Sequence, residues 1–203
     1  MRIHSLTLVS LVLTLCFTVP ACAQTSVGLS IYGAFSGTTS GNGTQQSPSN
    51  SAGGLIELRH ISNPILGVEV TYSYNRANQS YSLSAACPTT GCTNISPASV
   101  KANAHELTLD WIPSVPIGNL RPFGVLGLGL LLNRPSGSQN SNSSTQPVYV
   151  YGAGLDWGLL PHLGLRFQYR GNLYKAPDLT SLYRSTGAFT RTSQPMIGAY
   201  LDF

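Results

Sequence analysis

Charged side chains are scarce in this sequence, where Asp, Glu, Lys and Arg together make up 9% of 203 residues. Ordinary soluble domains carry roughly 25%, so the deficit argues against that class. Long hydrophobic runs are also missing beyond residue 19, and no later stretch approaches the roughly 18 apolar residues of a transmembrane helix. The mean hydropathy is still only +0.07, because Gly, Ser, Thr and Asn replace charged residues. This composition favours strands with apolar side chains on one face and small or polar ones on the other.

Cysteine is limited to four residues, and only Cys87 and Cys92 lie beyond the N-terminal segment. Four residues separate them, whereas a redox pair would have two, and a structural metal site would need four ligands. In an exported protein, two cysteines across a Pro- and Gly-containing turn predict a disulfide that closes a loop tip.

The N-terminus supplies an export signal. A basic start and an apolar run from Leu6 to Val19 lead to Ala21-Cys22-Ala23. This pattern predicts a signal peptide over residues 1–23, cleaved before Gln24, and a mature domain over residues 24–203. The apolar run is short for an uncleaved anchor, and Pro20 disfavours the alternative of lipoprotein processing at Cys22.

Period-2 alternation marks the strands. Val70, Tyr72 and Tyr74 share one face of the clearest strand, and Thr71 and Ser73 share the other. In the Gly/Leu-rich strand near residue 127 the facing is ambiguous, and we place Leu126, Leu128 and Leu130 outward. Eight strands are expected in all, over residues 26–35, 54–60, 66–75, 101–112, 122–132, 149–157, 163–172 and 196–203.

The connections alternate between long and short. Long loops are expected at residues 36–53, 76–99, 133–145 and 175–188, and tight turns lie between the other strands. The first loop is rich in Gly, Ser, Thr and Asn, a composition that predicts a mobile segment. Long loops on one side and short turns on the other are typical of outer-membrane barrels. An even number of strands then places the long loops outside the cell.

The chain ends on a strand with an apolar face, which would be an aggregation hazard in water but suits a barrel wall in lipid. Gly198, Leu201 and the terminal Phe203 resemble the C-terminal signal of Gram-negative outer-membrane β-barrels, although Met196 stands where that family usually has a polar residue. The resemblance implies recognition by the barrel-assembly machinery.

A second resemblance covers most of the mature chain. Tyr151-Gly-Ala-Gly-Leu-Asp-Trp157, followed by Leu165-Arg-Phe-Gln-Tyr-Arg170, is similar to the penultimate hairpin of small OmpA/OmpX-like barrels. It implies an all-β fold, a closed antiparallel eight-stranded transmembrane β-barrel in a Gram-negative outer membrane. It implies no activity.

Charged residues on the expected inward faces form the first candidate site. A narrow barrel interior requires such charges to pair, so we interpret them as a polar plug, with a proton or ion path as the alternative. The predicted network comprises Glu57, Arg59, Glu69, Glu106, Asp110, Asp156, Arg166, Arg170 and Asp202.

Basic residues at the long-loop rim form the second candidate site. They could contact phosphates of an anionic outer leaflet such as lipopolysaccharide, or they could be ordinary solvated charges. They are Arg76, Lys101, Arg134, Lys175, Arg184 and Arg191.

Catalytic patterns are weak. His60-Ile-Ser-Asn63 resembles the His-x-Ser-Asn motif of outer-membrane lipid A deacylases, but it enters a short periplasmic turn, far from outer-leaflet lipid. His105 and Glu106 are neighbours on a strand and therefore face opposite sides. We expect no enzyme, cofactor or nucleic-acid partner. The expected role is structural or surface-interactive, with an unknown extracellular partner; the alternatives are a lipid A-modifying enzyme and a secreted, soluble ligand-binding barrel.

Overall fold

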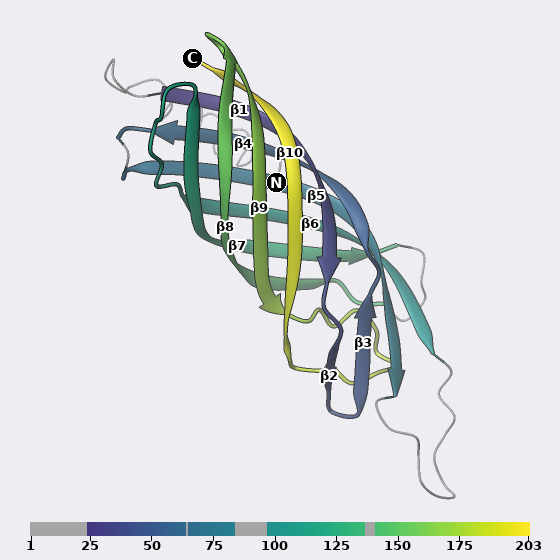
Figure 1. Ribbon diagram of the computed structural model, residues 1–203. Helices are drawn as coiled ribbons and strands as arrows, with labels where there is room; N and C mark the ends of the chain where they lie inside the picture. The colour runs from purple at the N-terminus through teal and green to yellow at the C-terminus, as the bar shows by residue number, and fades with distance from the viewer. Residues whose placement is uncertain (1–23, 64, 84–96, 137–140) are drawn as a thin grey trace, which may run out of the picture.

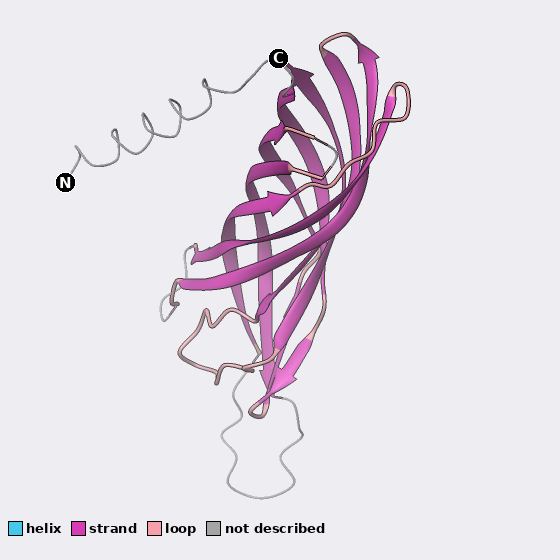
Figure 2. Ribbon diagram, turned by 90° about the vertical axis from the view of Figure 1, so that its left-hand side faces the viewer, coloured by secondary structure: helices cyan, strands magenta, loops and turns pink. Residues whose placement is uncertain are grey.

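The computed structural model describes residues 24–63, 65–83, 97–136 and 141–203. All its regular elements are strands (Figures 1 and 2). Within these ranges, no helix has the length and apolar character needed to cross a bilayer. The predicted signal peptide, Cys87 and Cys92 lie outside the described residues.

Eight long strands form a closed antiparallel barrel, as predicted. Each pairs with the next in sequence, and β1 pairs with β10 to close the ring (Figure 1). The barrel strands are β1 (Gln24–Ser36), β4 (Ser51–Ile61), β5 (Gly67–Leu83), β6 (Ala98–Trp111), β7 (Leu120–Pro135), β8 (Ser144–Leu160), β9 (Leu163–Lys175) and β10 (Phe189–Asp202).

The stagger of the ladders makes the barrel narrow and tilted. Residue pairings followed around the ring from Ser114 return to β6 at Ala104, ten residues earlier (114 minus 104). Strand number and stagger together set the diameter, and eight strands leave an interior that side chains can fill.

The two faces of the wall follow the predicted alternation. Val70, Phe167 and Leu201 are exposed on the outer surface, whereas Arg166 in the interior is 1% exposed. Leu126, Leu128 and Leu130 also face outward, as predicted for the ambiguous strand. An apolar outside and a charged inside suit a barrel in lipid. The soluble-barrel alternative, which required these faces to be exchanged, is wrong.

The first long loop differs from the prediction. Residues 36–53 were expected to be mobile, but they contain β2 (Thr39–Gly41) and β3 (Thr44–Pro48), which form a hairpin beyond the barrel end (Figure 1). Asn42 and Gly43 have φ of 51° and 77°, as the two-residue turn of a hairpin requires. β3 also pairs with β5. Paired backbone groups stabilise a segment that has few apolar side chains to bury.

The second loop is correspondingly shorter than predicted. β5 continues to Leu83, and β6 begins at Ala98, so their ladder extends past the lipid-facing region. Polar residues such as Gln79 and Ser80 end the apolar pattern without ending the strand. The register of β5 with β6 is continuous from Val68 to Tyr81.

Candidate functional site

The centre of the barrel holds a buried cluster of ion pairs. The Arg166 guanidinium donates from Nε to Asp156 Oδ1 at 2.6 Å and from Nη2 to Asp156 Oδ2 at 2.9 Å, and it also bonds Glu57. Arg59 donates from Nε to Glu69 Oε2 at 2.7 Å and from Nη1 to Asp156 Oδ2 at 2.9 Å. Asp156 therefore joins two arginines, which come from β4 and β9.

A second layer continues this cluster toward the outer end. Arg170 Nη1 donates to Asp110 Oδ2 at 2.8 Å, and Arg170 Nη2 lies 3.6 Å from Glu106 Oε1. Glu69 links the layers, because its carboxylate lies 3.9 Å from Arg170 Nη1 and also pairs with Arg59. Asn172 donates to Glu106 Oε2 at 2.6 Å. The structure thus brings together eight of the nine predicted network residues.

Asp202 is the ninth and lies apart. It is half-buried at the periplasmic mouth, where it lines a hollow of about 380 Å³ together with Gln24, Arg121 and Tyr200. None of the ion pairs found among the described residues connects Asp202 to the cluster. Asp202 is the last residue of β10, and this strand ends at the periplasmic rim of the barrel.

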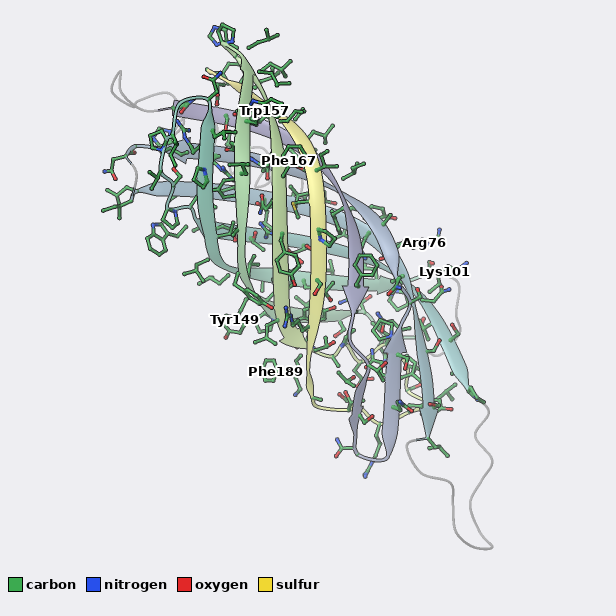
Figure 3. The ribbon with its side chains drawn as sticks, viewed as in Figure 1. Arg76, Lys101, Tyr149, Trp157, Phe167 and Phe189 are labelled. Atoms are coloured by element: carbon green, nitrogen blue, oxygen red, sulfur yellow. The ribbon has the colours of Figure 1, made fainter. Side chains whose placement is uncertain are left out.

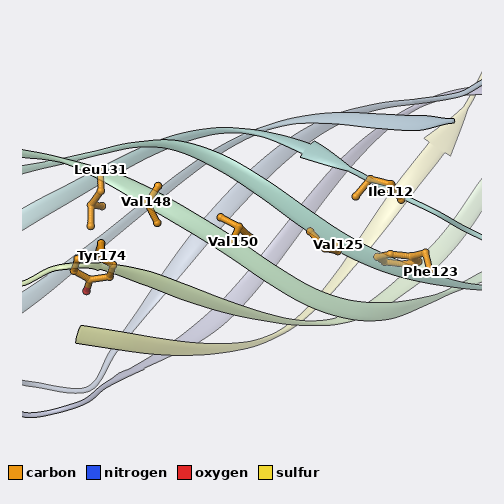
Figure 4. Close-up of a cluster of buried hydrophobic side chains, with 7 residues drawn as sticks. All are labelled: Ile112, Phe123, Val125, Leu131, Val148, Val150 and Tyr174. Atoms are coloured by element: carbon orange, nitrogen blue, oxygen red, sulfur yellow. The ribbon is translucent and has the colours of Figure 1, made fainter. Parts of the chain in front are cut away.

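Apolar side chains fill the part of the interior that the charges leave. The Phe123 ring lies under Arg59, whose Cζ is 4.1 Å from the ring centroid. A Cβ at Gly154 would overlap that ring, so glycine makes room for it on the neighbouring strand. This apolar cluster was not predicted from the sequence. It is seen in Figure 4 and consists of Ile112, Phe123, Val125, Leu131, Val148, Val150 and Tyr174.

Side chains also fill the interior on the outer side of the ion-pair cluster. A cavity of about 30 Å³ lies beside Glu106 and Asn172, room for about one or two waters. Further out, Leu179 from the last long loop is fully buried against Tyr81 and Val100. Gln46 Nε2 donates to Tyr81 Oη and to the Pro177 carbonyl, both at 3.2 Å. Among the described residues, the ion pairs, the apolar lining and this outer layer thus occupy successive levels of the interior.

Three predicted rim residues gather on the outer wall. Arg76 on β5 and Arg134 on β7 both stand opposite Asn103 of β6. Lys101 lies two residues further along β6 on the same face, and Figure 3 shows it close to Arg76. We call Arg76, Lys101 and Arg134 the β5–β7 basic patch. All three are exposed.

The other rim residues lie elsewhere. Lys175 and Arg191 are exposed on β9 and β10, and Arg184 is exposed in the last long loop. Arg191 Nη2 donates to Tyr169 Oη at 3.0 Å, and its Cζ lies 5.6 Å from the centroid of the Tyr151 ring. Arg191 is therefore an ordered cation on a second part of the wall.

Most acidic side chains lie inside the barrel, whereas most of the basic side chains are exposed outside it. Six of the seven acidic residues lie in the interior or at its periplasmic mouth, and the seventh, Asp178, is in the last long loop. Three arginines pair with acids inside, whereas six basic residues are exposed at or near the outer end. The lipid-facing wall of the described strands therefore carries cations and no acidic side chain.

The remaining candidate residues make local contacts at the short-turn end of the barrel. Asn63 Oδ1 accepts hydrogen bonds from the backbone N–H of Ile65 and Leu66, and the Nδ1 of His60 lies 3.0 Å from Thr25 Oγ1. Both lie at the short-turn end. Gly198 and Leu201 are on β10, and the backbone N–H of Phe203 donates to the Thr25 carbonyl at 2.9 Å. Among the described residues, no group of three or more His, Cys, Asp or Glu could hold a metal.

A closed eight-stranded barrel with an apolar outer wall, a charged interior and long loops at one end is an outer-membrane β-barrel of the Gram-negative type. The chain belongs to the family described as outer membrane protein beta-barrel domain, whose model matches residues 9–190. No curated protein matches it.

Solved structures with the same fold include small outer-membrane proteins. The attachment invasion locus protein Ail of Yersinia pestis, solved with the heparin analogue sucrose octasulfate, is 16% identical, with a TM-score of 0.53 over 89% of this chain and 99% of Ail. Neisserial surface protein A is 13% identical, with a TM-score of 0.52 over 90% and 98%. OprG from Pseudomonas aeruginosa is 12% identical, with a TM-score of 0.52 over 90% and 96%. At these identities the likeness concerns the fold.

Proposed function

We propose that this protein is a non-catalytic, sealed outer-membrane barrel that contacts the anionic headgroups of the outer leaflet through its basic rim, with a structural or adhesive role at the cell surface. The separation of charge carries the proposal. Five of the six exposed cations near the outer end lie on strands whose outer wall carries no acidic side chain, whereas the sixth, Arg184, lines a hollow with the exposed Asp178 in the last long loop. Phosphate groups of lipopolysaccharide would supply anionic partners for these cations.

Two further observations support a contact role. The ion-pair cluster and the apolar lining occupy the interior, and the cavity among them is too small for solutes. The similarly folded Ail was solved with sucrose octasulfate, a polyanionic sugar, which is the kind of ligand that a basic outer surface suits.

The alternative function, a lipid-modifying enzyme, has less support than the contact role. Its candidate motif, His60 to Asn63, lies at the short-turn end, where Asn63 caps the turn and His60 contacts Thr25. Outer-leaflet lipid is at the opposite end of the barrel. Assaying lipid A acyl chains with and without the gene distinguishes the two functions, and we expect no difference.

The proposal also includes how the protein is exported and assembled. Residues 1–23 would direct export and be removed, and the barrel-assembly machinery would recognise Gly198, Leu201 and Phe203. A disulfide between Cys87 and Cys92 would form in the oxidising periplasm.

Replacing the six rim residues by Gln tests the proposed contact. The substitutions are R76Q, K101Q, R134Q, K175Q, R184Q and R191Q. Each exposed cation near a charged lipid surface contributes about 1 kcal/mol, so we expect purified barrel to lose at least tenfold in affinity for lipid A vesicles at low salt, and less at high salt. Vesicle co-sedimentation measures this.

The matched control is R121Q, which removes an arginine at the periplasmic mouth and should leave lipid A binding unchanged. Equal binding by the wild type and the six-residue variant would end the proposal.

A further inference from the structure

The lipid-facing wall contains a polar cluster that its apolar surroundings do not explain. His105 on β6 lies between two outward tyrosines of β5, with its ring centroid 6.3 Å from that of Tyr72 and 5.1 Å from that of Tyr74. The Tyr72 hydroxyl and His105 Nδ1 share a hydrogen bond of 2.8 Å. The Tyr74 hydroxyl donates to Asn103 Oδ1 at 3.2 Å. We call Tyr72, Tyr74, Asn103 and His105 the wall cluster.

These two hydrogen bonds hold the wall cluster in place, but they do not use all of its hydrogen-bond donors. The amide NH₂ of Asn103 has two donors beyond the bond made by its oxygen, and when Tyr72 donates to Nδ1, the Nε2 of His105 carries the ring proton. Tyr72 is 44% exposed and Tyr74 is 41% exposed. Two aromatic rings and several polar groups therefore line one exposed, ordered piece of the wall.

The β5–β7 basic patch adjoins the wall cluster on its outer side. Tyr74 stands opposite His105, and the next outward row is Arg76, Asn103 and Arg134. Adjacent strands are about 4.8 Å apart, so the backbones that carry the two arginines are about 10 Å apart, and Lys101 lies about 7 Å further along β6. Arg76 Nη2 donates to Ser136 Oγ at 3.1 Å, which restricts that side chain. The three cations thus border the end of the cluster that faces the outer surface.

We propose that the wall cluster and the β5–β7 basic patch form one binding site for the phosphorylated sugar headgroup of an outer-leaflet glycolipid. The cations bind its phosphate, while the amide, imidazole and tyrosine groups bind sugar hydroxyls. This inference rests on the proposed function and adds to it a preference for lipids that carry a sugar headgroup. A glycerophospholipid also brings a phosphate to the arginines, but it has no sugar ring to meet the cluster below them.

Charge and position single out this occupant. The patch carries three cations, and the wall around it has no acidic side chain among the described strands. The cluster continues the outer face of β5, whose apolar part runs from Val68 through Val70 to Tyr72. A ligand that enters here must be anionic and polar at one end and apolar below it, as a glycolipid is.

The test compares two lipids on the full-length mature barrel. Native mass spectrometry counts the lipids retained from mixed vesicles that contain lipid A and phosphatidylglycerol in equal amounts. The cluster variant is Asn103→Leu with His105→Leu, and the cation variant is Arg76→Gln with Lys101→Gln and Arg134→Gln. Ser193→Leu is the control, because it removes another outward polar side chain, hydrogen-bonded to Tyr169, near Arg191. All variants are first shown to fold by the gel shift between heated and unheated samples.

We expect the wild type and the control to retain lipid A in preference to phosphatidylglycerol. The cluster variant should lose about tenfold of that preference, as two missing hydrogen bonds would produce, while its total anionic lipid changes little. The cation variant should lose both lipids. An unchanged preference in the cluster variant overturns this inference and leaves the proposed function standing if the cation variant still loses lipid. If neither variant changes lipid retention, both this inference and the proposed function are wrong.

Discussion

Replacing Arg166 with Met is expected to destabilise the barrel by about 3–5 kcal/mol, the usual cost of removing one partner from a buried ion pair. Arg166 binds Asp156 through two nitrogens and also bonds Glu57. Its loss leaves Glu57 buried without the arginine that it bonds, and it removes two of the three hydrogen bonds that arginines donate to Asp156, because only the bond from Arg59 remains. Methionine is similar in length, so the energetic change reports mainly on charge.

Urea unfolding of the refolded barrel, followed by tryptophan fluorescence and by the gel shift of unheated samples, measures this effect. Arg191→Met is the control, because it removes an exposed arginine of the outer wall and should leave the free energy of unfolding nearly unchanged. Adding Glu57→Gln to Arg166→Met should restore part of the loss. Equal stability of Arg166→Met and the wild type would show that the interior charges are not organised as described.

Deleting Phe203 is expected to remove most of the protein from the outer-membrane fraction of cells. The residue follows the last strand and is 76% exposed, and the hydrogen bond found for it joins its backbone N–H to the Thr25 carbonyl. Its structural contribution is therefore small, about 1 kcal/mol for one hydrogen bond. A large loss in cells would come from failed recognition by the assembly machinery.

Refolding into detergent separates these causes. The deleted chain should refold in vitro with nearly the wild-type yield and urea midpoint, while membrane fractions of cells contain little of it. Leu160→Ala, another exposed apolar residue at the periplasmic end, should leave the amount in cells unchanged. Normal amounts of the deleted protein in membranes would refute the assembly signal.

The sequence was informative wherever one face of a strand meets lipid. On β5 and β9 the alternation around Val70 and Phe167 predicted both the strand and its facing, because hydrocarbon on one side and a filled interior on the other impose a period of two. The alternation fades where strands leave the membrane, so the sequence predicts a loop from Arg76 to Leu83, where the structure has an extension of β5. Asn42-Gly43 is the kind of dipeptide that forms the turn of a hairpin such as β2–β3, but the prediction for residues 36–53 rests on their polar composition alone.

Contacts across the barrel depend on register, which the sequence does not specify. Alternation predicted that Arg166 and Glu57 face inward, yet their meeting depends on the ladders that join β9, β10, β1 and β4. The same is true of the wall cluster. His105 was considered only beside its sequence neighbour Glu106, whereas the β5–β6 register sets it opposite Tyr74.

Tryptophan quenching tests most directly whether the apolar wall faces hydrocarbon around a closed interior. The only two tryptophans, Trp111 and Trp157, both lie on the outer wall and are 43% and 44% exposed. In vesicles of lipids brominated on the acyl chains near the headgroup, tryptophan emission of the wild-type barrel should be strongly quenched, and aqueous iodide should have little effect. Quenching by iodide together with full emission in brominated lipid would show that this wall faces water instead of hydrocarbon.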